Sequence, residues 1–213
     1  MNSIKRIKFN VSLLGETQVG KTSMITVKSG LQFNENQLAT VGIDNFTDKA
    51  EFDNKEYKFK IFDTAGQERY NSISAQTIKV ADGFILVFSV DDKATLEKIR
   101  YWIKSIEDNV NIKEKSLILV GNKIDMKRQI TPDEGSNFAK EYNLKYFETS
   151  AKTGVGINEC FNEIYKDIYD KNKKLEGGNP NDGENNEQNN NQNIKLDKNK
   201  QKKHQKGNKP SRC

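Results

Sequence analysis

Residues 15–22, Gly-Glu-Thr-Gln-Val-Gly-Lys-Thr, have the residue types and spacing of a loop that wraps a phosphate chain. The glycines permit a backbone whose N–H groups point inward toward phosphate oxygens. We expect Lys21 to reach the β- and γ-phosphates and the Thr22 hydroxyl to coordinate Mg²⁺. The other positions expected to line this site are Gly15, Thr17, Gln18, Val19, Gly20 and Ser23. The pattern predicts a nucleotide site and leaves the identity of the base open.

Asn122-Lys123-Ile124-Asp125 follows an apolar run at 117–120 and has side chains suited to reading a base. A buried carboxylate such as Asp125 accepts two hydrogen bonds from guanine, whose N1–H and amino group are adjacent, and adenine offers no such pair. Each charge-assisted hydrogen bond is worth about 1.5–3 kcal/mol, so such a site would reject ATP by about 10⁴ or more. Ser150-Ala151-Lys152 follows the next short strand, where the Ala151 N–H would lie near the guanine oxygen.

Two further segments have residues suited to sensing a γ-phosphate. In Asp63-Thr64-Ala65-Gly66-Gln67, Asp63 would hold Mg²⁺ through water, Gly66 would bring its backbone N–H to the γ-phosphate, and Gln67 would orient the attacking water. Thr40 lies in a polar connection and would order that loop if it bound Mg²⁺ only with a γ-phosphate present. Taken alone, Thr40 is also typical of an ordinary loop threonine. Phe33 either packs against the core or lies edge-on to the base.

Short apolar runs alternate with longer helical patterns over residues 1–172, which predicts an α/β fold with helices on both faces of a mostly parallel sheet. An Asp53-Asn54 turn between two alternating runs predicts a hairpin, and therefore one antiparallel edge strand. The expected six strands are 7–14, 46–52, 57–62, 84–90, 117–120 and 146–149, and the expected helices are 22–29, 95–109, 132–142 and 157–170.

The predicted strands also place the chemistry. The phosphate loop, Asp63, Asn122–Asp125 and Ser150–Lys152 each follow the carboxyl end of a different strand. Because these ends share one edge of an open parallel sheet, we expect the four segments to meet there. The helix predicted from Pro132 is expected to begin with a capping box, in which Thr131 is the N-cap and Glu134 the third helical residue.

The net positive charge of the chain belongs to its C-terminal part. Residues 1–170 have 24 basic and 25 acidic side chains, whereas residues 171–213 have 11 basic and five acidic ones. This argues against a body that binds nucleic acid and favours a tail that meets an anionic surface. Residues 173–213 are rich in Asn, Gln, Gly and Lys with almost no aliphatic side chains, so we expect a disordered tail after a folded domain of residues 1–172.

Histidine and cysteine usage excludes several other chemistries. The only histidine, His204, lies in the tail, which argues against histidine-based triads and most zinc sites. Cys160 and Cys213 occur without a signal-peptide pattern, which predicts a reducing, cytosolic compartment. Cys160 has apolar neighbours at helical spacing and is predicted to be a core residue. No apolar run reaches the roughly 18 residues that a membrane span needs.

Together these motifs resemble, in order and spacing, the five nucleotide motifs of the Ras superfamily of small GTPases, over residues 5 to about 172. The resemblance implies the P-loop small G-domain fold, GTP and GDP as ligands with Mg²⁺, and slow hydrolysis stimulated by a GTPase-activating protein. It assigns Phe33 to stacking beside guanine and Thr40 to Mg²⁺. The segments Leu38–Asp44 and Glu68–Ile73 look most like the Rab branch of vesicle-trafficking GTPases. That implies effectors and an exchange factor as partners, a monomer, and reversible association with the cytosolic face of an intracellular membrane.

The chain departs from the Rab pattern at some positions that face effectors in the family. At those positions this chain has Asn45, Phe62 and Thr77-Ile78. Thr17 and Gln18 stand where the Ras branch has small residues beside the γ-phosphate. The sequence therefore does not determine how fast this chain hydrolyses GTP. The last residue, Cys213, is not part of a C-a-a-X box. The resemblance favours its prenylation, and the alternative is an unmodified thiol on a solvated tail.

Three alternatives remain from the sequence. A P-loop kinase or ATPase would leave Asn122–Asp125 unexplained, and an adaptor that holds GTP without hydrolysing it would leave Gln67 unexplained. A small GTPase that signals outside trafficking, as the Ras branch does, would share every nucleotide motif.

Overall fold

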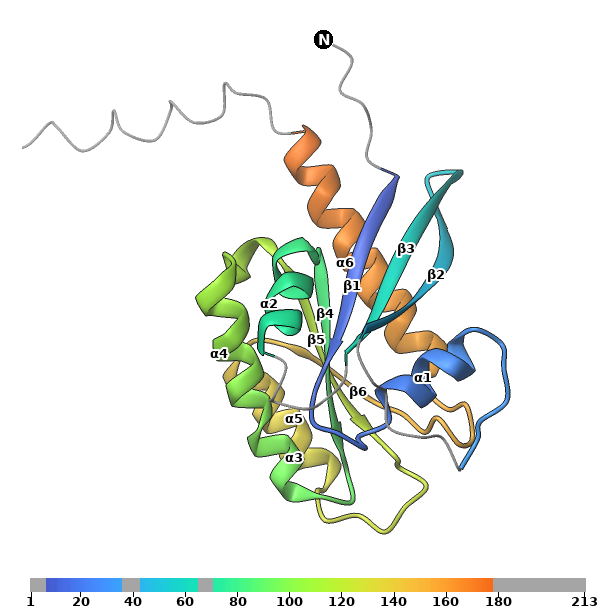
Figure 1. Ribbon diagram of the computed structural model, residues 1–213, viewed down its shortest axis with the longest axis vertical. Coiled ribbons are helices and arrows are strands. Elements are labelled where there is room, and N and C mark those ends of the chain that lie inside the picture. Colours follow the sequence, from blue (N-terminus) through green and yellow to red (C-terminus); the bar gives the residue numbers. More distant parts are fainter. Residues whose placement is uncertain (1–6, 36–42, 65–70, 178–213) are drawn as a thin grey trace, which may run out of the picture. The chain divides into compact units, whose positions relative to one another are not determined.

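The computed structural model describes residues 7–35, 43–64 and 71–177 (Figure 1). Within them, six strands form one sheet in the order β2-β3-β1-β4-β5-β6. The β2–β3 pair is antiparallel and the other neighbours are parallel, which confirms the predicted sheet with one antiparallel edge strand. The strands are β1 (Lys8–Leu14), β2 (Ile43–Phe52), β3 (Lys55–Thr64), β4 (Gly83–Ser89), β5 (Ser116–Asn122) and β6 (Lys145–Glu148).

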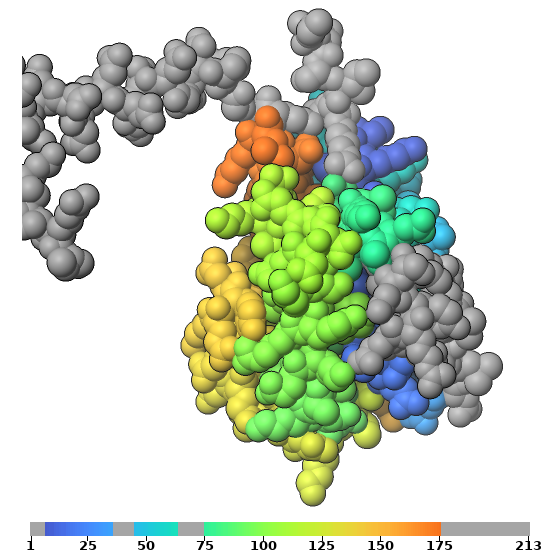
Figure 2. All heavy atoms as spheres, turned by 60° about the vertical axis from the view of Figure 1, so that its left-hand side comes forward, coloured from blue at the N-terminus to red at the C-terminus, as the bar shows by residue number. Residues whose placement is uncertain are grey.

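Helices cover the sheet on both faces, as predicted. The first hydrophobic core lies between the sheet and helices α1 and α6, and the second lies under α2 to α5 on the opposite face. Figure 2 shows the molecule from the side of the second face, where atoms of the segments coloured green and yellow form the surface. The helices are α1 (Lys21–Lys28), α2 (Asn71–Val80), α3 (Lys93–Glu97), α4 (Ile99–Asn109), the 3-10 turn η2 (Ile112–Glu114), α5 (Pro132–Glu141) and α6 (Ile157–Gly177).

Local sequence signals explain the clearest of these elements. Asp53 and Asn54 both have positive φ angles, 49° and 56°, as a two-residue hairpin turn of type I′ requires. The predicted capping box is present: the Thr131 side chain accepts from the Glu134 N–H while the Glu134 carboxylate accepts from the Thr131 N–H. β4 is buried along its whole length, as an apolar central strand between two helical layers should be.

The largest differences from the prediction lie in three helical regions. Helix α2 was not predicted, because its sequence is largely polar and it is held by the packing of Ile78 and the following Ala81 in the second core. The single helix expected over 95–109 is two helices, α3 and α4, which meet at Lys98. α3 begins at Lys93, earlier than the expected start at 95. Asp92 is its N-cap, because the Asp92 carboxylate accepts a hydrogen bond from the Ala94 N–H.

The third difference concerns the C-terminal helix. α6 continues to Gly177, beyond the expected end at 170 and into the segment predicted to be a disordered tail from 173. Long side chains hold its last turns to the body: Lys171 donates to the Lys115 carbonyl, and the Lys173 ammonium lies 2.7 Å from Asp53. Lysine contacts of this kind leave no apolar pattern in the sequence. Residues 178–213, with His204 and Cys213, lie outside the described residues.

Cys160 is fully buried in the first core, which confirms its predicted place. Burial raises the pKa of its thiol to about 12, so this cysteine is an inert core residue. In the part of the chain that the structure describes, no helix combines the length and apolar character needed to cross a membrane.

Candidate functional site

The phosphate loop leaves the carboxyl end of β1 and leads into α1 within six residues. Its glycines are required by close contacts: a Cβ atom on Gly15 would lie 2.1 Å from the Val87 carbonyl oxygen. At Gly20, which has φ +95°, a Cβ would lie 2.4 Å from the Asn122 amide nitrogen. Any side chain at either position would therefore push the loop away from the sheet edge.

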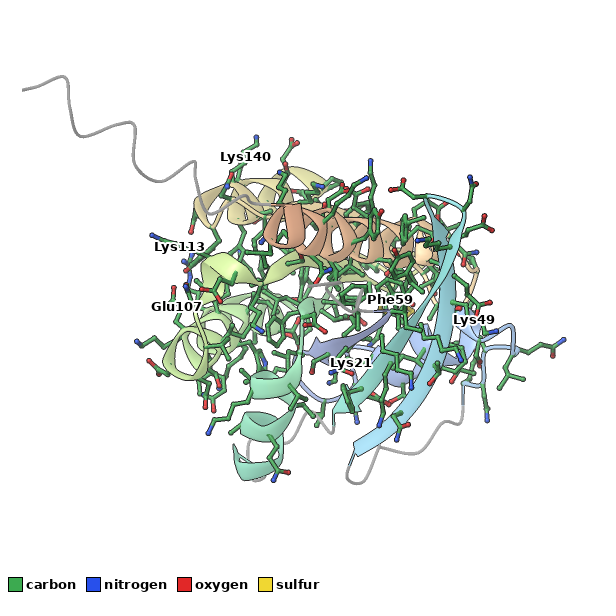
Figure 3. The ribbon with its side chains drawn as sticks, turned by 90° about the horizontal axis from the view of Figure 1, so that it is seen from above. Lys21, Lys49, Phe59, Glu107, Lys113 and Lys140 are labelled. Atoms are coloured by element: carbon green, nitrogen blue, oxygen red, sulfur yellow. The ribbon has the colours of Figure 1, made fainter. Side chains whose placement is uncertain are left out.

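Lys21 is the buried cation of the site, with only 5% of its surface exposed. Its ammonium group donates to the carbonyl oxygens of Gly15, at 2.7 Å, and Glu16, at 2.8 Å. Burial lowers the pKa of Lys21 to about 8, and the nearby carboxylates of Asp63 and Glu16 partly oppose that shift. A buried ammonium held by two backbone carbonyl oxygens is suited to an anionic ligand (Lys21 is labelled in Figure 3).

The first turn of α1 adds further groups for an anion. Gly20 occupies its N-cap without a capping side chain, so the first N–H groups of α1 depend on other partners. Thr22 and Ser23 are half-buried in this turn, whereas Thr17 and Gln18 are exposed on the loop. Val19 is fully buried in the first core, so only its backbone is available to a ligand.

The two described oxygen ligands expected for Mg²⁺ lie on neighbouring elements. Asp63 is 3% exposed at the end of β3, beside Leu13 in register, and interacts electrostatically with Lys21. Thr22 follows Lys21 directly in the chain. A hydroxyl and a carboxylate are the hard oxygen donors that Mg²⁺ prefers, so the donor set fits this ion. Across the described ranges, no three or more His, Cys, Asp or Glu side chains are grouped to hold a metal. Thr40, Gly66 and Gln67 lie outside the described residues.

Asn122 joins the phosphate loop to both base-reading segments. It is fully buried, and its amide nitrogen donates to the Val19 carbonyl at 2.9 Å. Its amide oxygen accepts from the Thr149 hydroxyl at 3.0 Å and from the Ala151 N–H at 3.3 Å. The sequence pattern indicated a base-reading role for this residue and gave no sign of this brace. Asn122 therefore sets the distance between the phosphate end and the base end of the site.

Asp125 and Ser150 lie together at the base end. The Ser150 hydroxyl donates to an Asp125 carboxylate oxygen at 2.5 Å, and the Thr153 N–H donates to the same hydroxyl at 3.1 Å. Ser150 is fully buried, but Asp125 is exposed, so the expectation of a buried carboxylate was wrong. Asp125 lies three residues beyond the end of β5, in a loop outside the sheet edge. The serine nevertheless fixes the direction of the carboxylate.

Lysine contacts in this region were not anticipated. The half-buried Lys123 has its ammonium 3.8 Å from Asp91, whose carboxylate accepts from the Ser89 hydroxyl. The exposed Lys152 ammonium lies 2.5 Å from Glu35. Asp91 follows the end of β4, and site residues are expected after the carboxyl ends of parallel strands, so this position could have been predicted from the sequence. The sequence has no comparable signal for Glu35.

Phe33, for which the sequence left two places open, is half-buried and packs against the first core. It lies two residues before Glu35 on the segment that follows α1. Both residues therefore belong to the stretch of chain that leads from α1 toward Thr40.

The described site thus brings together Gly15–Ser23, Asp63, Asn122–Asp125 and Ser150–Lys152 at the carboxyl edge of the sheet, as the order of the strands predicts. The profile of the Ras family matches residues 10–170, a range that includes all of these residues. The chain belongs to the Ras family. Its members are GTPases that use GTP, GDP and Mg²⁺.

Within the Ras family, the chain is similar to Rab proteins. Ras-related protein Rab-13 of Mesocricetus auratus is 36% identical over 173 residues, covering 80% of this chain and 85% of that protein. Ras-related protein Rab-8A of Bos taurus is 37% identical over 175 residues, covering 81% of this chain and 84% of that protein. The chain is a Rab-like small GTPase.

Proposed function

We propose that this protein is a Rab-type switch in intracellular membrane trafficking: it binds GTP or GDP with Mg²⁺, hydrolyses GTP slowly, and presents different surfaces in its two nucleotide states. The observation that most supports a single nucleotide site is the buried Asn122, which is hydrogen-bonded to the phosphate loop and to the Thr149–Ala151 segment. Two halves held in this way have a fixed spacing, which suits one ligand with a phosphate end and a base end.

At the phosphate end, Lys21 and the first N–H groups of α1 would neutralise the β- and γ-phosphates. Mg²⁺, held by Thr22, Thr40 and Asp63, would supply further charge stabilisation there. Gln67 would orient the attacking water, and the Gly66 N–H would donate to the γ-phosphate. Hydrolysis by such a site alone is slow, on the order of 10⁻⁴ s⁻¹, and an activating protein accelerates it. The reaction therefore acts as a timer, and the output is binding to effectors.

At the base end, Asp125 would accept hydrogen bonds from N1–H and the amino group of guanine. The Ser150 hydroxyl holds the carboxylate in place at 2.5 Å, so little ordering is left for the ligand to impose. The Ala151 N–H makes only a long bond of 3.3 Å to Asn122, and the guanine oxygen is expected to compete for it. Phe33, Lys123 and Lys152 would contribute their apolar surfaces around the base.

The folded domain is followed by the basic tail, which we assign to attachment. Prenylation of Cys213 would supply one weak anchor, and the tail's lysines would supply the second at about 1 kcal/mol per residue near an anionic leaflet. Mass spectrometry of the protein from its native cells is expected to show a C-terminal peptide heavier by one isoprenoid group. An unmodified peptide would contradict this assignment and leave the nucleotide chemistry untouched.

Competition binding tests the central proposal. Fluorescent GDP bound to the full chain with Mg²⁺ is expected to be displaced by GDP and GTP at equimolar concentration, and not by about 1,000-fold more ATP. Effective displacement by ATP would favour the kinase or ATPase alternative. A single-turnover assay is then expected to show slow phosphate release from bound GTP. No release, even with an activating protein, would favour the non-hydrolysing adaptor.

A further inference from the structure

The loop that follows β5 is exposed in its middle. Residues 125–127, which include the carboxylate proposed to read guanine, all have exposed side chains. Backbone hydrogen bonds hold the loop near its two ends. At the start, the Ile124 N–H donates to the Thr149 carbonyl at 3.1 Å; toward the end, the Gln129 N–H donates to the Val90 carbonyl at 2.8 Å. The middle of the loop therefore depends on side-chain contacts.

Arg128 makes a two-pronged contact from this loop to the sheet. Its two terminal guanidinium nitrogens donate to the two carboxylate oxygens of Glu148, each at 2.7 Å, and both side chains are less than one-third exposed. A bidentate pair of this kind fixes direction as well as distance, because a planar fork meets a planar carboxylate. Arg128 therefore ties the exposed loop to the last residue of β6.

Together with Ser150, this pair closes a ring of contacts at the base end. Glu148 lies two residues before Ser150, whose hydroxyl donates to an Asp125 oxygen at 2.5 Å. Asp125 in turn lies three residues before Arg128. We call these four residues the base ring. Because each of its links is a hydrogen bond or a short piece of chain, a shift of the Asp125 carboxylate would strain or break one of the contacts.

Glu148 is itself held from a second side, by Tyr146. The Tyr146 hydroxyl donates to one of the Glu148 carboxylate oxygens at 2.9 Å. Two glycines make room for the tyrosine: a Cβ atom on Gly121 would lie 2.8 Å from its hydroxyl oxygen, and one on Gly135 would lie 2.5 Å from it. The ring also stacks on Phe88, with the two ring planes 9° apart. Because the tyrosine is closely packed, the Glu148 carboxylate is a firm attachment point for the loop.

We propose that Arg128 is a positioning residue for base recognition: through Glu148 and the base ring, it holds the Asp125 carboxylate in the direction in which both oxygens reach guanine. The inference rests on the proposed function and deepens it, since it names what sets the preference for a base with an amino group beside its N1–H. The role needs no contact between Arg128 and the nucleotide.

The two hydrogen bonds to guanine together demand more of the carboxylate than one bond does. Hypoxanthine has the N1–H of guanine and lacks the amino group, so it needs only one carboxylate oxygen. A carboxylate that turns can keep one bond, whereas two bonds require both oxygens to stay aligned with the base. Loss of the Arg128 contact should therefore weaken the binding of GDP more than that of inosine diphosphate, whose base is hypoxanthine.

Arg100 offers a matched comparison elsewhere in the molecule. Its guanidinium donates to the Glu141 carboxylate at 2.9 Å and to the Tyr142 hydroxyl at 2.6 Å, which ties α4 to the end of α5. Like Arg128, it joins two elements through a glutamate with a tyrosine beside it, but none of these residues belongs to the base ring. An arginine that only stabilises the fold should behave as Arg100 does.

Competition against fluorescent GDP, with the full chain and Mg²⁺, measures the affinities for GDP and inosine diphosphate. The wild type is expected to prefer GDP by about 10- to 100-fold, the value of one hydrogen bond to a charged group. Arg128→Ala should weaken GDP binding by about tenfold and inosine diphosphate binding by less than about threefold, so the preference should shrink. Arg128→Lys, which keeps the charge without the fork, should shrink it less. Arg100→Ala should leave the preference unchanged.

Thermal unfolding of the same variants separates positioning from stability. Arg128→Ala and Arg100→Ala are expected to lower the midpoint of unfolding by similar amounts, less than about 4 °C, because both remove a partly exposed pair. Should Arg128→Ala fail to fold, Tyr146→Phe provides a milder test. It removes only the hydroxyl that holds Glu148 and should shrink the preference for GDP by about twofold.

The outcomes distinguish this inference from the proposed function. Equal losses for the two nucleotides in Arg128→Ala, or an unchanged preference in both Arg128→Lys and Tyr146→Phe, would overturn the inference and leave the proposed function standing. So would an equal shrinkage in Arg100→Ala, or a wild type that binds both nucleotides equally well. A wild-type chain that binds neither nucleotide would instead overturn the proposed function, and the inference with it.

Discussion

The two ends of the nucleotide site offer a ligand different kinds of chemical group. At the phosphate end, Gly15–Thr22, the groups offered to a ligand are backbone N–H groups with one buried ammonium, and the loop side chains of Thr17 and Gln18 are exposed. At the base end, side chains hydrogen-bond to one another: Ser150 holds Asp125, and Thr149 holds Asn122. The phosphate end should therefore tolerate changes of side chain that spare its glycines, Lys21 and Thr22. The base end should tolerate very few.

The largest effect is expected from removing the buried cation of the phosphate end. Lys21→Met should weaken GDP and GTP binding by about 10²–10⁴-fold, because two charge-assisted hydrogen bonds to phosphate are lost at about 1.5–3 kcal/mol each. The loss should be the same whichever base the nucleotide has. Isothermal titration measures it, with Lys140→Met as the control. A loss below about tenfold would contradict the assigned role of Lys21.

A change at the base end should instead alter which base is bound. Asp125→Asn replaces one of the two carboxylate acceptor oxygens by an NH₂ donor and removes the charge, so guanine loses one of its two hydrogen bonds and GDP affinity should fall by about 100-fold. The new amide can donate to a carbonyl at that position, so xanthosine diphosphate should bind more tightly than it does to the wild type. Competition assays with both nucleotides measure the ratio. Equal losses for the two would show that Asp125 does not read the base.

Asn122→Ala should damage both ends, because Asn122 is the brace between them. It would leave the Val19 carbonyl, the Thr149 hydroxyl and the Ala151 N–H without their buried partner, which should lower the free energy of unfolding by about 2–4 kcal/mol. Urea unfolding with saturating GDP measures the change. The matched control is Asn137→Ala, an exposed asparagine on α5. A loss below about 1 kcal/mol would show that the two ends do not depend on this residue.

A smaller effect is expected beside the base end, at the last residue of β6. Both Glu148 carboxylate oxygens accept from Arg128 at 2.7 Å, and this guanidinium lowers the pKa of Glu148. Because the folded pKa is below the unfolded one, the pair stabilises the fold above the ordinary glutamate pKa. Its contribution is lost as the pH falls through the lower folded value.

Glu148→Gln should therefore lower the free energy of unfolding by about 1 kcal/mol at neutral pH, and by progressively less as the pH falls below about 4. Urea unfolding of both proteins across this pH range measures the difference. A difference that does not change with pH would mean that the carboxylate acts by packing alone.

The smallest effect is expected at the exposed ion pair between Glu35, on the segment after α1, and Lys152, at the base end. More than half of each of these side chains is exposed. Exposed pairs contribute little, so Glu35→Gln should speed GDP dissociation by only about two- to fivefold at low salt. The difference should disappear as salt screens the pair. Stopped-flow dissociation of fluorescent GDP measures the rates. An unchanged rate at low salt would place this contact outside the control of nucleotide release.

Where the chain's own local signals are strong, the sequence predicted the molecule well. The type I′ turn at Asp53-Asn54, the capping box at Thr131 and the buried Cys160 all depend on residues within a few positions of one another. The order of the strands also placed the phosphate loop, Asp63 and the Asn122–Asp125 segment at one edge. Topology alone requires this, because parallel strands have their carboxyl ends on the same side.

What the sequence by itself determined was the fold class, the phosphate loop and the kinds of ligand that its motifs suit. Only the tertiary structure decided how those motifs are held: Asn122 reaches Val19 across 103 positions, and Lys152 reaches Glu35 across 117. It also decided that α2 forms from a polar segment, that α6 continues to Gly177, and that Asp125 is exposed. The physical reason is common to all of these. Each depends on contacts with distant parts of the chain, and such contacts leave no periodic pattern or local spacing in the residues themselves.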